Sequence, residues 1–155
     1  MRLISPVLLG NLEDTRRLGE RLAAHLRVGD CVFLLGDLGA GKTSLARGVI
    51  EALTGETDAP SPTYTIVQTY ETDAGEELLH ADLYRIEDES EIEEIGLEEA
   101  FDQAICLIEW PDRLGRLAPP DRLELDIRRE DGDDPEKRSV RITGRGKWES
   151  RVDDL

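Results

Sequence analysis

The sequence predicts an α/β fold, in which buried strands alternate with helices, followed by a C-terminal antiparallel hairpin. Three observations lead to this prediction. The apolar runs Cys31–Leu35 and Ala104–Glu109 have the continuous hydrophobicity of strands that are buried on both faces. A helical periodicity precedes the first run, and another helix is expected directly after the loop that follows it. Near the C-terminus, apolar and polar residues alternate in two short segments, as expected for a hairpin.

The first elements follow from capping and periodicity. Residues 2–9 predict a strand, and Asn11 is suitably placed to cap a helix. Leu18, Leu22 and Leu26 recur about one helical turn apart, so we expect the helix to reach about residue 26. A turn over 28–30 then leads into the first buried strand.

The middle of the chain predicts loops, a helix and a hairpin. A glycine-rich loop spans 36–43, and the helix that it opens continues over 44–53. Residues 63–71 and 78–84 have the composition of strands, and the turn at 73–76 between them predicts a hairpin.

The C-terminal half contains an acidic helical segment over 88–101 that we expect to break at Gly96. After the second buried strand, residues 110–117 predict a short helix, which Pro119 and Pro120 end. The final hairpin turns near 131–134 and is recognised by the apolar positions Leu123, Leu125, Ile127, Val140 and Ile142. We expect one domain over residues 1–145 and a loose C-terminal tail over 146–155.

The composition favours a cytoplasmic protein. The chain has 155 residues, and no apolar run approaches the roughly 20 residues of a membrane span. Cys31 and Cys106 lie inside apolar runs, so we expect both to be buried and reduced. Asp and Glu total 35 against 19 Lys and Arg, which gives a formal net charge of −16. Such a charge opposes tight direct binding of RNA.

The glycine-rich loop reads GDLGAGKT and matches the phosphate-binding pattern G-x-x-x-x-G-K-[ST], known as the P-loop. In this pattern the backbone N–H groups wrap around the β-phosphate, Lys42 reaches the β- and γ-phosphates, and Thr43 offers its hydroxyl to Mg²⁺. The motif lies between a buried strand and a helix, which is the expected context. We therefore predict that ATP with Mg²⁺ binds at Gly36, Asp37, Leu38, Gly39, Ala40, Gly41, Lys42, Thr43 and Ser44, and that Lys42 is also catalytic.

Two acidic residues end apolar strands and are candidates for the second half of the site. Asp82 ends LLHAD and Glu109 ends ICLIE, and strand ends of this kind meet at the ligand crevice of an α/β sheet. The alternative is that each is a solvated strand end. The segment SPTYT at residues 61–65 contains Thr63, whose hydroxyl is a candidate sensor of the γ-phosphate; an ordinary proline-stiffened loop is the alternative.

Five segments, GDLGAGKTSLARG, SPTYTIVQTYE, LLHADLYRI, EEIGLEEAF and CLIEWPDRL, resemble in this order the TsaE family, the small ATPases required for threonylcarbamoyladenosine modification of tRNA. The resemblance covers about residues 10–145. It implies a P-loop NTPase fold, a three-layer αβα sandwich with a mixed sheet. It also implies that Thr43 and Glu109 contact Mg²⁺, that Asp82 is important for hydrolysis and that Trp110 lies near the nucleotide.

The same resemblance implies that the partners are the TsaD and TsaB proteins and that ATP hydrolysis resets their complex between turnovers. The tRNA would then be contacted only through the complex. No arginine is clearly placed as a catalytic finger, so we expect weak ATPase activity that partners stimulate.

Other nucleotide-binding classes remain as alternatives. A small-molecule P-loop kinase needs an arginine-bearing lid, for which Arg85, Arg113 and Arg116 are the candidates, but no arginine-rich lid is evident. A Ras-type GTPase is disfavoured because the only asparagine, Asn11, precedes the P-loop. The two strand-end acids argue weakly against an adaptor that binds nucleotide without hydrolysing it.

Overall fold

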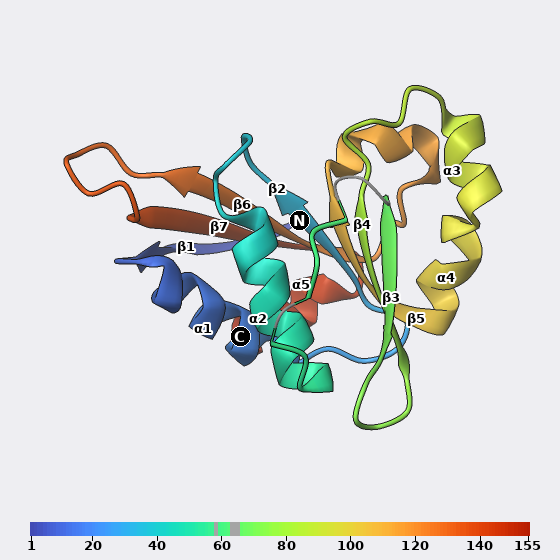
Figure 1. Cartoon of the computed structure of the whole chain (residues 1–155), viewed down its shortest axis with the longest axis horizontal. Helices are drawn as coiled ribbons and strands as arrows, with labels where there is room; N and C mark the ends of the chain where they lie inside the picture. Colours follow the sequence, from blue (N-terminus) through green and yellow to red (C-terminus); the bar gives the residue numbers. More distant parts are fainter. Residues whose placement is uncertain (58, 63–65) are drawn as a thin grey trace.

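The fold is built on one mixed sheet of seven strands (Figure 1). The computed structural model describes residues 1–57, 59–62 and 66–155. Across the sheet the strand order is β1-β7-β6-β2-β5-β4-β3. The strands are β1 (Arg2–Leu9), β2 (Cys31–Leu35), β3 (Val67–Glu71), β4 (Glu77–Asp82), β5 (Ala104–Glu109), β6 (Arg122–Arg129) and β7 (Arg138–Arg145).

The four central strands β6, β2, β5 and β4 are parallel, whereas β3, β7 and β1 pair antiparallel at the two edges. The helices are α1 (Leu12–Ala23), α2 (Lys42–Thr54), α3 (Glu89–Ile95), α4 (Leu97–Gln103) and α5 (Trp148–Arg151), with the 3₁₀ segments η1 (Pro111–Leu117) and η2 (Val152–Asp154). The predicted α/β fold with a mixed sheet is confirmed, as is the C-terminal hairpin of β6 and β7.

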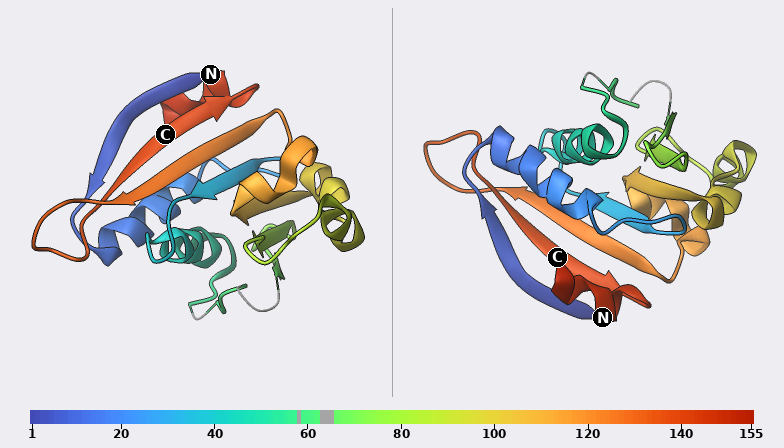
Figure 2. Two further views of the ribbon diagram at one scale, coloured as in Figure 1. Left: turned by 90° about the horizontal axis from the view of Figure 1, so that it is seen from above. Right: turned by 90° about the horizontal axis from the view of Figure 1, so that it is seen from below.

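Two hydrophobic cores lie on opposite faces of the sheet. Strand β2 contributes to both, because alternate side chains of a strand point to opposite faces. Val32 and Leu34 belong to the core beneath α1 and α2, and Phe33 belongs to the core that contains Ile92 of α3 and Leu97 of α4. Helices therefore cover both faces of the central strands (Figure 2).

Helices α1 and α2 pack closely because glycine occurs on both. A side chain at Gly19 would place its Cβ 2.5 Å from the carbonyl oxygen of Leu45, and one at Gly48 would place it 2.3 Å from that of Arg16. Asn11 caps α1 as predicted by accepting from the backbone N–H of Asp14 at 2.8 Å. The helix ends at Ala23, three residues before the expected boundary at residue 26.

The middle hairpin is shorter than the sequence predicts. Strand β3 begins at Val67, and the expected strand residues 63–65 lie outside the described part of the chain. Strand β4 ends at Asp82 and not at residue 84. The carboxylate of Asp82 accepts from the backbone N–H of Tyr84 at 3.0 Å, which turns the chain away from the sheet.

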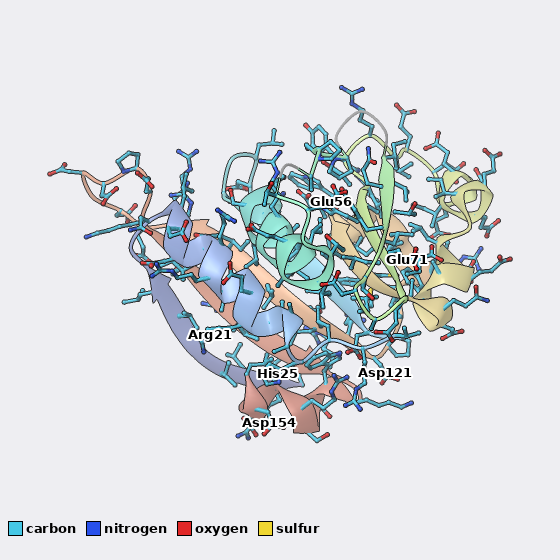
Figure 3. The ribbon with its side chains drawn as sticks, turned by 60° about the horizontal axis from the view of Figure 1, so that its bottom comes forward. Arg21, His25, Glu56, Glu71, Asp121 and Asp154 are labelled. Atoms are coloured by element: carbon cyan, nitrogen blue, oxygen red, sulfur yellow. The ribbon has the colours of Figure 1, made fainter. Side chains whose placement is uncertain are left out.

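The prediction of a loose tail over 146–155 is wrong. Trp148 is 1% exposed and belongs to the core beneath α1. Arg151 stacks on its ring at 3.8 Å and pairs with Asp30 at 2.6 Å. Figure 3 shows this C-terminal segment, which carries Asp154, next to the end of α1 near Arg21 and His25. A four-residue helix is too short to show a repeating pattern of apolar residues, so the sequence did not indicate that Trp148 is buried.

Cys31 and Cys106 are buried and free, as predicted. They face each other in the β2–β5 register, and burial raises the pKa of Cys106 to about 12. None of the helices within the described residues is long and apolar enough to cross a membrane.

Candidate nucleotide-binding site

The candidate site lies where the central parallel strands end. Strand β2 runs into the P-loop, residues 36–43, whose last two residues begin α2. In the sheet register Leu34 is opposite Glu109, and Glu109 is opposite Asp82. The two predicted acids therefore lie side by side at the edge of the sheet from which the P-loop emerges, as the strand-end argument predicts.

The P-loop backbone has a conformation that requires glycine. Gly36, Gly39 and Gly41 have φ values of 142°, 76° and 113°. The loop also passes so close to β6 that a Cβ on Gly36 would lie 2.5 Å from the carbonyl oxygen of Ile127. A side chain at this first glycine is therefore incompatible with the observed path.

The start of α2 offers unpaired backbone donors. Within the described residues, no acceptor contacts the N–H groups of residues 41–44, and the first bonded amide is that of Leu45, which donates to Gly41 at 3.0 Å. Free N–H groups and the positive end of the helix dipole favour an anion at this position.

The side chain of Lys42 is held between the loop and an aromatic ring. Its Nζ donates to the carbonyl oxygen of Gly36 at 2.6 Å and lies 3.7 Å from the ring centroid of Trp110. Burial lowers the pKa of Lys42, and the neighbouring carboxylates of Glu109 and Asp82 oppose that shift. Trp110 itself has a left-handed backbone with φ 57°, directly after β5, and its ring contacts Tyr84 at 4.9 Å.

The carboxylate of Glu109 is buried beside the hydroxyl of Thr43. Both of its oxygens lie 3.4 Å from the Thr43 Oγ1, and one of them lies 2.6 Å from Nε2 of His80. An ionised carboxylate only accepts, so His80 donates from Nε2, and no group of the described residues forms a hydrogen bond with its buried Nδ1. His80 thereby fixes the orientation of the Glu109 carboxylate.

These oxygen atoms fit a magnesium ion bound together with a nucleotide. Within the described residues, no group of three or more His, Cys, Asp and Glu side chains forms a metal cage. Mg²⁺ prefers one or two protein oxygens and takes its remaining ligands from phosphate and water. The adjacent oxygens of Thr43 and Glu109 match that preference.

An open cleft of about 550 Å³ lies against the P-loop. It is lined by the loop, by Lys42, by residues 110–112 and by residues 126–129 of β6. Its volume lies within the range of small-ligand pockets.

The tertiary structure assembles most of the predicted site residues and adds others. The P-loop, Asp82, Glu109 and Trp110 converge, whereas Thr63 lies outside the described residues. Sequence reasoning did not identify His80, nor Arg129 and Arg138, which contact the P-loop from the C-terminal hairpin. The segment LLHAD placed His80 two residues before a candidate acid, and that spacing was the only available signal.

Comparisons with known proteins identify relatives in sequence and in fold. Residues 9–140 match the sequence profile of a family described as threonylcarbamoyl adenosine biosynthesis protein TsaE. A Bacillus subtilis protein named tRNA threonylcarbamoyladenosine biosynthesis protein TsaE is 41% identical over 137 residues, which cover 88% of this chain and 83% of that protein. A Streptomyces coelicolor protein of the same name is 39% identical over 137 residues, covering 86% and 93% of the two chains. The crystal structure of Bacillus subtilis YdiB superposes with a TM-score of 0.80 at 32% identity, covering 99% of this chain and 95% of that one.

Proposed function

The chain belongs to the TsaE family, and on that premise we propose that it binds and hydrolyses ATP with Mg²⁺ in support of threonylcarbamoyl modification of adenosine in tRNA. The observation that carries the proposal is the convergence of Lys42, the Thr43–Glu109 pair and Asp82 at one sheet edge. Together they supply a cation for the phosphates, oxygen ligands for a metal and a second carboxylate for proton transfer.

Each group has a defined part in the proposed reaction. The unpaired N–H groups at the start of α2 and the charge of Lys42 bind the β- and γ-phosphates. Thr43 and Glu109 would hold the Mg²⁺, which would neutralise charge on the phosphate oxygens. Asp82 is 8% exposed and accepts the proton of the attacking water. The ring of Trp110 covers Lys42 and limits the access of other water to it.

We further propose that the chain acts in the cytoplasm on a complex of TsaD and TsaB, which ATP hydrolysis resets between turnovers. The formal net charge of −16 supports indirect contact with tRNA through that complex.

Slow hydrolysis by the isolated chain is part of the proposal. Among the described residues, Arg129 and Arg138 contact the P-loop, but both donate to its carbonyl oxygens. Arg128, which lines the cleft with Arg129, is paired with Asp126 at 3.0 Å. None is a free arginine finger, a group worth roughly 10³- to 10⁵-fold in rate when a partner supplies it.

The test follows the γ-phosphate of labelled ATP in the purified chain, with and without the TsaD–TsaB pair of the same organism. We expect slow release of inorganic phosphate that the pair accelerates at least tenfold. Transfer of the label to a metabolite would support the small-molecule kinase alternative instead. Fast hydrolysis that the pair does not change would contradict the proposed partnership.

A further inference from the structure

Arg138 is a buried cation in direct contact with the back of the P-loop. It begins β7 and is 5% exposed. Its Nε donates to the carbonyl oxygen of Ala40 at 2.6 Å, and its Nη2 lies 3.5 Å from that of Gly39. Its Nη1 donates to the carbonyl oxygens of Pro135 at 2.6 Å and Lys137 at 3.0 Å. The hairpin of β6 and β7 that carries it can be followed in Figure 1 beside the loop between β2 and α2.

No carboxylate compensates this charge within the described ranges, where no Asp or Glu oxygen lies within 4.0 Å of its guanidinium nitrogens. Two partly buried arginines of β6 and β7 do have a carboxylate partner. Arg145 pairs with Glu124 at 2.6 Å, and Arg122 pairs with the same carboxylate at 3.0 Å. A buried charge without a counter-charge destabilises the folded state. The chain has 35 acidic residues, yet none of those described pairs with Arg138, so we expect a bound anion to compensate its charge.

The hydrogen bond to Ala40 also orients the loop. The carbonyl of Ala40 and the N–H of Gly41 belong to one planar trans peptide and therefore point in opposite directions. Because Arg138 holds the carbonyl, the Gly41 N–H points away from the guanidinium. That N–H is one of the unpaired donors at the start of α2.

We propose that Arg138 is a positioning residue of the P-loop and that the phosphates of a bound nucleotide supply the counter-charge that its buried guanidinium lacks. The inference rests on the proposed function, since it concerns the same phosphate site. It assigns the C-terminal hairpin a part in nucleotide affinity. Arg129 reaches the Gly39 carbonyl at 3.2 Å from an exposed position, so water competes for its contact.

The test measures MgATP affinity by titration calorimetry in the full chain at several KCl concentrations. Arg138→Met removes the charge and the hydrogen-bond donors. Arg138→Lys keeps the charge but loses the planar guanidinium group and its fixed arrangement of N–H donors. Arg141→Met is the matched control, because Arg141 is exposed on the same strand and lies on the opposite face. Urea unfolding of each variant verifies that it is folded.

We expect Arg138→Met to bind MgATP on the order of 10- to 100-fold more weakly, as for the loss of charged hydrogen bonds. The salt dependence of affinity should become shallower in this variant, because a cation behind the P-loop that attracts the phosphates is gone. Arg138→Lys should lose less affinity and keep the steeper salt dependence, and Arg141→Met should bind within threefold of the parent chain.

A folded Arg138→Met variant that binds within threefold of the parent would overturn the inference, as would weaker binding with an unchanged salt dependence. If Arg138→Met does not fold, Arg138→Lys decides: a loss of more than threefold supports the inference and a smaller loss overturns it. A parent chain that does not bind MgATP would refute the proposed function itself, which distinguishes the two failures.

Discussion

Replacement of Trp148 by alanine tests whether the C-terminal segment is part of the folded core. The side chain is 1% exposed in the core beneath α1, and truncation of a buried tryptophan costs about 3–5 kcal/mol. The cation–π contact with Arg151 at 3.8 Å adds about 0.5–1 kcal/mol. A total of about 3.5–6 kcal/mol is a large part of the roughly 5–15 kcal/mol that stabilises a typical domain.

Urea unfolding followed by circular dichroism measures this loss. With a slope of about 2 kcal/mol per molar urea, the midpoint of Trp148→Ala should fall by about 2–3 M. Trp148→Phe is the control, since it retains most of the buried ring and should lose much less. A midpoint of Trp148→Ala within 0.5 M of the parent (about 1 kcal/mol on the same slope) would show that residues 146–155 are dispensable, as the sequence alone suggested. The phenylalanine variant also leaves Trp110 as the single tryptophan, whose fluorescence should change when nucleotide binds beside Lys42.

Three further predictions concern the site. Lys42→Ala should abolish productive ATP binding, because the cation for the β- and γ-phosphates is lost; unchanged affinity in calorimetry would contradict the P-loop assignment. Glu109→Ala should weaken Mg²⁺-dependent ATP binding more than Mg²⁺-free binding, whereas Asp82→Asn should leave binding nearly intact and slow hydrolysis. The reverse pattern in binding and phosphate-release assays would exchange these two roles. His80→Leu should lower the affinity for Mg²⁺ in the presence of ATP by about 10- to 100-fold, the usual effect of losing a group that orients a metal ligand. His80→Gln, which retains a donor, should recover part of the loss, and equal magnesium titrations for all three proteins would refute the role of His80.

The agreement between sequence and structure is greatest where a pattern is local. The run CVFLL and the loop GDLGAGKT are contiguous, and each is recognised from neighbouring residues alone. The cap at Asn11 and the helix break at Gly96 are local in the same sense, because backbone groups a few residues away decide them. Element boundaries were less accurate, as at the end of α1, since helix ends depend on what packs against them.

The sequence by itself therefore determined the fold class, the family and the phosphate-binding loop of this protein. Only the tertiary structure decided which distant residues complete the site and the core. Arg138 and Ala40 are 98 residues apart in the chain, and Arg151 and Asp30 are 121 apart. The contact between Arg138 and Ala40 exists because β6 lies beside β2 and thereby places the C-terminal hairpin next to the P-loop. Strand order is set by the free energy of the whole packed sheet, which no short segment of the chain encodes.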